Sequence, residues 1–352
     1  MAEEKRIPTV FDIAREAGVS RGTVDRVIHH RGRFSEETAA RVHEAIERLG
    51  YSANPNAALL ASKKSYTLAC LIPAFKEGEY WELIQQGLLA GAQEARRYNI
   101  EVRMFLYDQT DIGSFRTECA AVLEARPSGV ILNAVFKDAV TEFAGRLDSA
   151  GIPYAFLDNK VDGLGNFLYI GIDPYRSGYL GAFLLTANQQ VDSLVLIRLV
   201  RDKGRQGDPN EPRRRGFLDY IHEQLPACTI HTVFIDPNDP TGIIPTLEAF
   251  FREHPEVRHI AMTNSRIHLI APFLEQHPEP RRIAVGFDDL ERNLAALKAG
   301  QIEYLVTHHI HDQARLAIEI FSDYLVRKIT PPRRNHYVHL DILHRLNLDD
   351  YS

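Results

Sequence analysis

The sequence predicts a small all-α head followed by an α/β body of two doubly wound, parallel-sheet lobes. Three observations lead to this fold class. The first sixty residues contain three short amphipathic stretches separated by Gly and Ser. From about residue 66, apolar runs of strand length alternate with longer amphipathic stretches, as in sheets covered by helices on both faces. About ten such strands in a chain of 352 residues suit two lobes better than one sheet.

The composition supports a globular chain with large cores. Hydrophobic residues make up 45% and charged residues 25%, which excludes a disordered or collagen-like protein. There is no apolar run of 18 or more residues and no apolar N-terminal stretch of signal-peptide length, so we expect a cytoplasmic protein that does not cross a membrane. Residues 1–65 hold 11 Lys and Arg against 9 Asp and Glu, whereas the whole chain has a net charge of −6. The head alone therefore suits contact with nucleic acid.

Each helix of the head is predicted from its cap and its apolar face. Thr9 caps a helix over Val10–Ala17, Ser20 caps a second over Arg21–His29, and Ser35 precedes a third. A helix, a tight turn and a second helix in succession form a helix-turn-helix, whose second helix enters the major groove of DNA. A small three-helix interaction module with a solvated arginine face is the alternative.

The outward side chains of the second helix are the candidates for reading bases. Arg21 and Arg26 offer the two-pronged donor that guanine accepts. Asp25 is either an acceptor for cytosine or an ion-pair partner of a neighbouring arginine. Ser20, Thr23 and the loop of residues 31–33 are placed for phosphates.

Two stretches of the head resemble the LacI/GalR family of bacterial transcription regulators. They are TVFDIAREAGVSRGTVDRVI at 9–28 and AIERLGYSANPNAALL at 45–60. The resemblance implies that residues 54–62 form a helix when paired in a dimer on DNA, and that Leu60 enters the minor groove and bends the duplex. An ordinary linker helix is the alternative. Gly22 departs from the larger side chain common in the family, so the operator sequence is not predicted.

The complete set of expected DNA-binding residues is Thr9, Ser20, Arg21, Gly22, Thr23, Asp25, Arg26, Arg31, Asn54, Ala57 and Leu60. The expected domains are the head (1–53), a hinge helix and linker (54–65) and a ligand-binding body (66–352). Within the body, lobe 1 is expected at 66–166 and 306–329, and lobe 2 at 167–305 and 330–352.

The body elements follow the alternation of patterns. The predicted strands are Leu68–Ile72, Val102–Leu106, Gly129–Leu132, Tyr154–Leu157, Leu168–Ile172, Leu194–Leu199, Thr232–Ile235, His259–Met262, Ile283–Phe287 and Tyr304–Val306. The predicted helices are Tyr80–Tyr98, Thr117–Ala125, Pro174–Gln189, Arg214–Gln224, Ile243–Phe251, Ile267–Gln276 and Asp312–Arg327. From about Tyr66 to the C-terminus, the body resembles the type I periplasmic binding-protein fold that the family uses to sense effectors.

Two doubly wound lobes leave a cleft at the carboxyl ends of their strands, where small ligands bind. The resemblance implies that Arg213, Asn264 and Asp288 grip sugar hydroxyls. Asp173 stands near the crossover between lobes, and His308 stands where relatives carry glutamine. Asp173 and Asp288 could instead be helix caps. The complete set of expected effector-binding residues is Phe75, Tyr80, Trp81, Asn133, Asp158, Asp173, Arg213, Asn264, Asp288 and His308.

Aromatic side chains after the first strand of the body can stack on a pyranose, although Trp81 suits a core position equally well. His308, His309, His311 and Asp312 resemble a metal cluster in composition, yet neighbours on an extended segment point to opposite faces, so neither a metal nor another cofactor is expected. Six cations between residues 201 and 215 indicate either an acidic or phosphorylated sugar as effector or a solvated loop.

The expected function is regulation of transcription. A homodimer, with a tetramer as the alternative, binds a palindromic operator on double-stranded DNA, most simply as a repressor, and responds to a carbohydrate effector. A solute-binding protein or a small-molecule enzyme with the same α/β body is the alternative. We expect no enzymatic activity, because the sequence has no Gly-rich phosphate loop and no nucleophile elbow.

Overall fold

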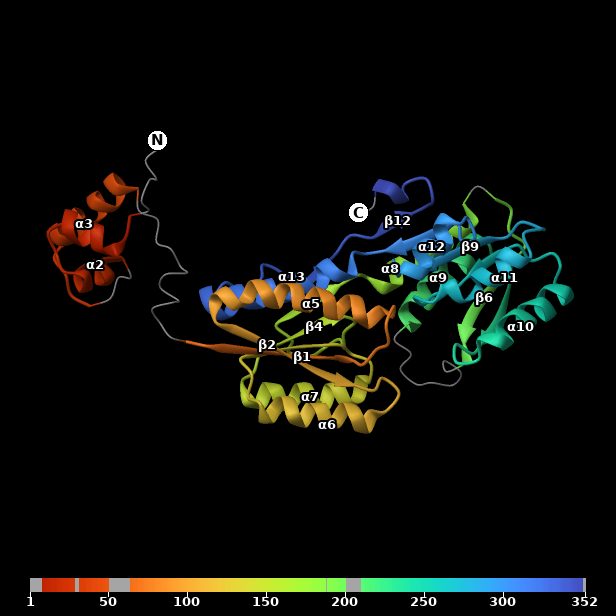
Figure 1. Cartoon of the computed structure of the whole chain (residues 1–352), viewed down its shortest axis with the longest axis horizontal. Coiled ribbons are helices and arrows are strands. Elements are labelled where there is room, and N and C mark those ends of the chain that lie inside the picture. Colours follow the sequence, from red (N-terminus) through yellow and green to blue (C-terminus); the bar gives the residue numbers. More distant parts are fainter. Residues whose placement is uncertain (1–7, 29–31, 51–63, 188, 201–209, 351–352) are drawn as a thin grey trace. The chain divides into compact units, whose positions relative to one another are not determined.

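The computed structural model describes residues 8–28, 32–50, 64–187, 189–200 and 210–350. The chain divides into two compact units, residues 1–63 and 64–352 (Figure 1). Among the described residues, no helix is both long and apolar enough to span a bilayer.

The first unit is a three-helix head. Its helices are α1 (Val10–Glu16), α2 (Arg21–Ile28) and α3 (Glu36–Leu49). The Thr9 backbone N–H donates to the Asp12 carboxylate over 2.9 Å at the start of α1, and Ser35 Oγ accepts from the Thr38 N–H at the start of α3. The core consists of apolar side chains from all three helices, among them Ile13, Val24, Val27 and Val42, which are fully buried. The three predicted helices are therefore present.

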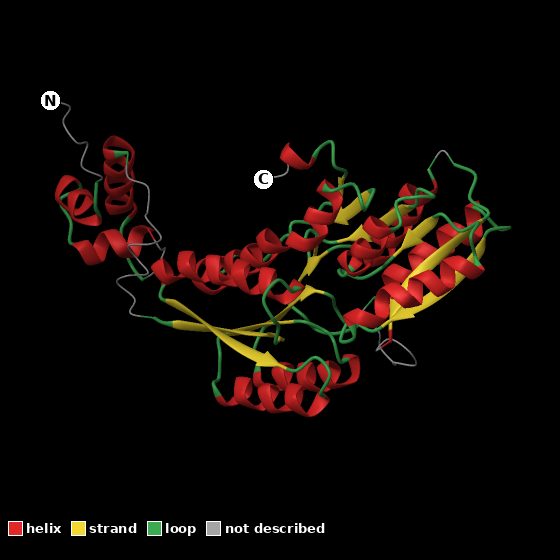
Figure 2. Ribbon diagram, turned by 45° about the vertical axis from the view of Figure 1, so that its right-hand side comes forward, coloured by secondary structure: helices red, strands yellow, loops and turns green. Residues whose placement is uncertain are grey.

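The second unit contains two six-stranded sheets, one in each lobe (Figure 2). The first sheet has the order β11-β5-β4-β3-β1-β2, and all its strands are parallel. Its strands are β1 (Tyr66–Pro73), β2 (Ile100–Tyr107), β3 (Gly129–Leu132), β4 (Tyr154–Asp158), β5 (Leu168–Gly171) and β11 (Asn335–Tyr337). The second sheet has the order β12-β10-β9-β8-β6-β7, and β12 alone runs antiparallel. Its strands are β6 (Ser193–Leu199), β7 (Thr229–Ile235), β8 (His259–Ala261), β9 (Ile283–Phe287), β10 (Tyr304–Thr307) and β12 (Asp341–Leu343).

Helices cover both faces of each sheet, which confirms the predicted fold class. On the first sheet, α5 and α13 lie on one face and α6 and α7 on the other (Figure 1). These helices are α5 (Tyr80–Ala95), which continues into η1 (Arg96–Tyr98), α6 (Ile112–Glu124), α7 (Lys137–Ala150) and α13 (Ile310–Arg327). On the second sheet, one core includes α8 and α9 and the other includes α10, η3, α11 and α12. Their bounds are α8 (Pro174–Thr186), α9 (Glu211–Gln224), α10 (Pro240–Glu253), η3 (Ile267–Ile270), α11 (Ala271–Gln276) and α12 (Glu291–Lys298), and η4 (Leu348–Asp350) follows β12.

Strand pairing corrects the expected lobe boundaries. β5 and β11 belong to the first sheet, although both fall within the ranges expected for lobe 2. β10 belongs wholly to the second sheet, although lobe 1 was expected to resume at residue 306. The chain therefore changes lobe after β5, after β10 and after β11. A short buried strand has the same apolar sequence pattern in either sheet, so this pattern alone cannot show to which sheet the strand belongs.

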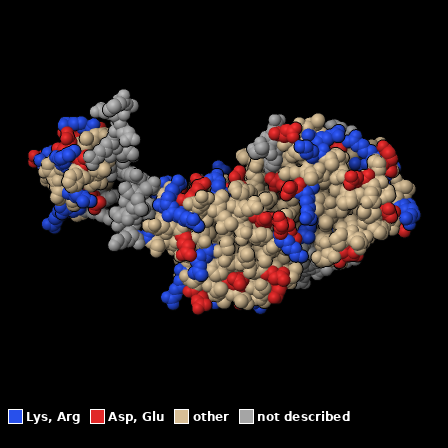
Figure 3. Space-filling model, in the orientation of Figure 1, with Lys and Arg blue, Asp and Glu red and all other residues tan. Residues whose placement is uncertain are grey.

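Charged side chains of both signs are interspersed over the surface of the second unit on the face shown in Figure 3.

Candidate functional site

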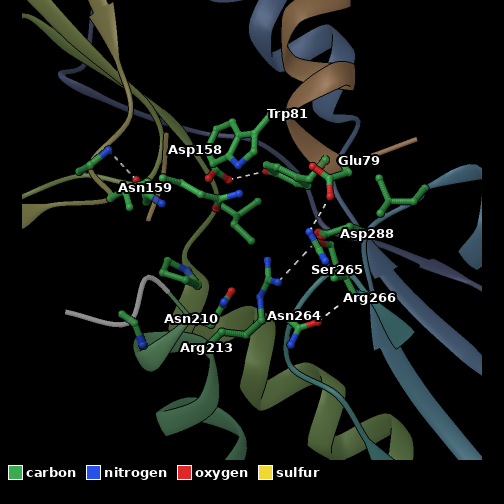
Figure 4. Close-up of a pocket in the computed structure, with 18 of the residues that line it drawn as sticks. Glu79, Trp81, Asp158, Asn159, Asn210, Arg213, Asn264, Ser265, Arg266 and Asp288 are labelled. Carbon is green, nitrogen blue, oxygen red and sulfur yellow. Dashed lines mark hydrogen bonds and ion pairs between the residues drawn. The ribbon is translucent and has the colours of Figure 1, made fainter. Parts of the chain in front are cut away.

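A cavity of about 610 Å³ lies between the two lobes of the second unit (Figure 4). Its walls come from segments that follow the carboxyl ends of strands in both sheets, which is the usual ligand position in open α/β sheets. The volume is in the range that small-molecule sites occupy.

Asp158 is one of the acidic groups that lobe 1 presents to this cavity. It ends β4 in a left-handed conformation, with φ of 72°. The Tyr80 hydroxyl donates to its Oδ1 over 2.5 Å, and Asn133 Nδ2 donates to its Oδ2 over 3.3 Å. Burial raises the pKa of Asp158, against the opposing effects of the Tyr80 hydrogen bond and the charge of His308. Burial and then the Asp158 charge raise the pKa of Tyr80, which therefore stays a donor.

Asp288 is the corresponding acidic group of lobe 2. It follows β9, again with a left-handed φ, of 68°. Its Oδ2 lies 3.5 Å from Nη1 of Arg213, which begins α9 and stacks on the Phe287 ring at 4.6 Å. Its Oδ1 lies 3.4 Å from His308 Nε2. Burial would raise the pKa of Asp288, but Arg213 and His308 outweigh it and the pKa is lowered.

His308 completes this charged group. Burial alone would lower its pKa, but contact with Asp288 and the negative charges of Asp288 and Asp158 outweigh burial, so the pKa is raised. When His308 is protonated, two acidic groups face two basic groups, Arg213 and His308.

Oδ1 of Asp288 already faces His308 Nε2, whereas Nε of Arg213, a buried donor, has no hydrogen-bond partner within the described part of the chain. Buried polar atoms are nearly always satisfied in proteins. A ligand with hydroxyl groups suits this charged site, because each hydroxyl donates and accepts.

Seven of the ten expected effector residues line the cavity, namely Tyr80, Trp81, Asp158, Asp173, Arg213, Asn264 and Asp288. Two of them also have a local structural role. Asp173 caps α8 by accepting from the Arg176 N–H over 3.1 Å. Asn264 Oδ1 accepts from the Arg266 N–H over 2.9 Å, which leaves its amide nitrogen available to a ligand.

Three expected contacts are corrected, because Phe75, Asn133 and His308 do not line the cavity. Asn133 and His308 are almost completely buried behind the two acidic residues, which they position. His308 lies behind Asp288 because β10 ends at Thr307 and α13 begins at Ile310 after a left-handed turn at His309.

The histidine side chains of residues 308–311 do not point toward one common site. His308 faces Asp288, His309 Nε2 lies 2.6 Å from the Asp341 carboxylate, and His311 lies 3.4 Å from its neighbour Asp312. Elsewhere, His231, His254 and Glu256 bring potential metal-ligand atoms within 4.8 Å of one another, a group that sequence spacing did not indicate.

Sequence reasoning missed an ion pair across the cavity. Arg266 Nη2, from lobe 2, lies 2.8 Å from Glu79 Oε1, which precedes α5 in lobe 1 (Figure 4). It also missed His268 on the cavity wall. Both depend on contacts between segments far apart in the sequence, so no local pattern could have identified them.

In the head, α2 presents the expected DNA-contacting side chains. Arg21, Gly22, Asp25 and Arg26 are exposed, whereas the valines of the same helix face the core. Arg26 Nε donates to the Gly22 carbonyl over 3.1 Å, and its Nη2 donates to Thr23 Oγ1 over 3.2 Å. Thr9 and Ser20 lie at the starts of α1 and α2, whereas Arg31, Asn54, Ala57 and Leu60 lie outside the described residues.

Comparison with known protein families identifies both parts of the chain. Residues 9–54 match the model of bacterial regulatory proteins of the lacI family, and residues 69–329 match a periplasmic binding protein domain. The regulator pepR1 of Lactobacillus delbrueckii subsp. lactis is 44% identical over 251 residues, covering 69% of this chain and 70% of that protein. The regulator GntR of Pseudomonas aeruginosa is 28% identical over 201 residues, and this match spans 54% of this chain but only 56% of GntR.

Solved structures agree with this assignment. A crystal structure assigned as a LacI transcriptional regulator from Bacteroides fragilis matches with a TM-score of 0.74 and 31% identity, covering 82% of this chain and all of that one. A glucose-galactose binding protein from Geobacillus stearothermophilus has the same fold, with a TM-score of 0.69 and 19% identity over 81% of this chain and 99% of its own. The chain therefore belongs to the LacI family of bacterial regulatory proteins.

Proposed function

We propose that this protein is a DNA-binding transcription regulator that represses its target genes and responds to a sugar or sugar derivative. Its homodimer binds a palindromic operator through the helix-turn-helix head, and the effector binds between the two lobes.

The cavity between the lobes carries the effector part of this proposal. Asp158 comes from one lobe and Asp288 and Arg213 from the other, so a ligand that contacts all three favours closure of the lobes. The Asp288 carboxylate and the Arg213 guanidinium both line the cavity and suit a donor and an acceptor on adjacent carbons of a polyol. The aromatic rings of Tyr80 and Trp81 line the same cavity and can cover an apolar sugar face.

The head carries the DNA part of the proposal. Its exposed arginines on α2 match the donor geometry of major-groove readout. A dimer places two heads at half-sites about one helical turn apart, so a change in dimer geometry changes operator affinity. The expected hinge, residues 54–65, lies almost wholly outside the described residues, and its role as the coupling element stays a proposal. A solute-binding protein would share the body but would leave the head without a role.

A mobility-shift assay on the DNA upstream of the protein's own gene tests the DNA part. We expect Arg26→Ala to weaken specific binding by about 1–3 kcal/mol and to relax base choice, once Arg26 leaves the Gly22 carbonyl to reach a base. The matched control is Arg48→Ala on α3, where the arginine pairs with Glu16 and Glu44 and lies off α2. Unchanged DNA binding by the Arg26 variant would show that Arg26 does not contact bases. Absence of DNA binding by the wild type would overturn the proposed function.

A further inference from the structure

His268 is a cavity residue that no sequence motif marks. It is the second residue of η3, the short helix that follows β8, and its half-buried side chain lines the cavity. Its Nδ1 lies 2.8 Å from Oδ1 of Asn293, a fully buried residue of α12. The chemical state of the His268 ring therefore depends on the orientation of the Asn293 amide.

The contacts of Asn293 allow one orientation of its amide. Its Nδ2 lies 3.0 Å from the Ser265 carbonyl, 3.1 Å from the Phe287 carbonyl and 3.0 Å from the Asp288 carbonyl. Carbonyl oxygens only accept, so the amide nitrogen must face them. Its Oδ1 accepts from the backbone N–H of His268 over 3.1 Å, which requires an oxygen there. A flipped amide would place Oδ1 against three carbonyl oxygens and the NH₂ group against the His268 backbone N–H.

The amide orientation then determines the tautomer of His268. Because Asn293 Oδ1 can only accept, His268 Nδ1 must carry the hydrogen and donate it. In a neutral imidazole the other nitrogen, Nε2, is then an acceptor. Burial lowers the pKa of His268, and the charges of Arg292 and Arg266 add to this against the Asn293 hydrogen bond, so the ring is neutral near pH 7. Nε2 has no hydrogen-bond partner among the residues that the structure describes.

We propose that His268 is a specificity-determining residue of the effector site, which accepts a hydrogen bond at Nε2 from a hydroxyl of the bound ligand. Asn293 is the positioning residue that holds the ring in this tautomer. The inference rests on the proposed function and deepens it, because a bare acceptor discriminates between ligand classes. A hydroxyl donates to Nε2, whereas a carboxylate or phosphate oxygen is an acceptor and meets repulsion. At this one position the ring therefore selects a hydroxyl over a carboxylate or phosphate oxygen.

The first test is calorimetry on the full chain. The probes are D-ribose, D-glucose, D-galactose, D-mannose and D-fructose, with D-glucuronate and D-glucose 6-phosphate as charged counterparts. Two variants separate packing from hydrogen bonding. His268→Phe keeps a ring but has no acceptor, and His268→Gln restores an acceptor oxygen. For the sugar that binds the wild type, we expect His268→Phe to lower affinity about tenfold and His268→Gln to stay within about threefold.

Mono-deoxy analogues of that sugar identify the hydroxyl concerned. One analogue should bind the wild type about tenfold more weakly than the parent sugar, yet bind His268→Phe as well as the parent does. The matched control is His277→Phe, because His277 ends α11 outside the cavity and pairs through Nε2 with Glu248 at 3.1 Å. This control should leave the affinity of every probe unchanged.

A second test needs no ligand. A ¹H–¹⁵N spectrum of the histidine ring nitrogens should show the Nδ1–H tautomer for His268, and Asn293→Ala should convert it to a mixture. An Nε2–H tautomer in the wild type would overturn the inference. So would wild-type affinity of His268→Phe for the bound sugar. If no probe binds the wild type, the proposed function fails and the ligand role of His268 fails with it, whatever the tautomer.

Discussion

At the scale of single residues, two acidic side chains at equivalent strand ends differ in their surroundings. Asp158 ends β4 and Asp288 follows β9, each the third strand of its sheet, and both have the left-handed backbone that is uncommon outside glycine. Such strain concentrates at functional sites. Asp288 has two cationic neighbours, whereas Asp158 forms no ion pair with a described residue. Asp288 is therefore stabilised by ionic contacts, whereas Asp158 is held by hydrogen bonds from the neutral donors Tyr80 and Asn133.

The raised pKa of His308 predicts how stability depends on pH. A group whose pKa is raised in the folded state stabilises it fully below its ordinary pKa, 6.5 for histidine, and this contribution is lost as pH rises through the folded value. We expect the free energy of unfolding lost in His308→Gln to be larger at about pH 6 than at about pH 9, as measured by urea denaturation. The exposed His222→Gln is the control, with a small difference at either pH. An equal or larger loss at the higher pH would contradict the assigned interaction.

Some cavity residues could be predicted from the sequence because they obey a local rule. Asp158, Arg213 and Asp288 follow strands or begin a helix, and the carboxyl ends of parallel strands meet at one edge. His268 and Asn293 obey no such rule, since their contact depends on how η3 packs against α12. The sequence also could not show that a left-handed turn at His309 would leave His308 behind Asp288 instead of in the cavity.

At the scale of elements, a close helix crossing positions Arg213. A Cβ atom at Gly178 of α8 would overlap the Arg213 carbonyl, and one at Gly216 of α9 would overlap the Tyr175 carbonyl. The two helix backbones therefore touch directly, and only glycine fits at both positions. This crossing sets the start of α9, from which Arg213 reaches the cavity.

The crossing predicts opposite effects for two glycine substitutions. Gly178→Ala should lower the free energy of unfolding by about 1–3 kcal/mol, because a backbone carbonyl must move, and should also weaken effector binding. A Cβ atom at Gly145 of α7 meets open space, so Gly145→Ala should raise the free energy of unfolding by up to about 1 kcal/mol through helix propensity. Urea denaturation and calorimetry measure the two effects. A neutral Gly178→Ala would show that the crossing tolerates a methyl group.

Most elements were predicted from their apolar patterns, but two helices, α7 and α12, were missed although both are amphipathic. β11 and β12 were not predicted either, since each has three residues and they read Asn-His-Tyr and Asp-Ile-Leu. The sheet to which β5 belongs could not be predicted either. β5 pairs with β4 and with β11, and β11 follows more than 160 residues later in the sequence. Long-range pairing, and not local propensity, decided these cases.

At the scale of the whole ligand-binding unit, a direct ion pair joins the lobes. The Glu79 and Arg266 side chains are 27% and 22% exposed, so water screens them only in part. Acidic and basic side chains also adjoin where the lobes meet in Figure 3. The pair therefore links the two lobes directly across the cavity.

Removing this pair should favour the open arrangement of the lobes. We expect Arg266→Ala to lower effector affinity about twofold to fivefold and to increase the radius of gyration of the unliganded protein in solution scattering. The control is Arg281→Ala, because Arg281 forms a pair of the same length, 2.8 Å, with Glu303 within one lobe. Equal effects of the two substitutions would show that the Glu79–Arg266 pair has no special role in closure.

The central claim is that ligand capture between the lobes controls DNA binding by the head. The most direct measurement is a fluorescence anisotropy titration of operator DNA with the full chain, with and without the sugar that calorimetry identifies. The account predicts that the sugar changes the operator Kd about 5-fold to 150-fold, that operator changes the sugar Kd by the same factor, and that Asp288→Asn binds operator normally without responding. The same operator Kd in the absence and presence of a saturating sugar would contradict it.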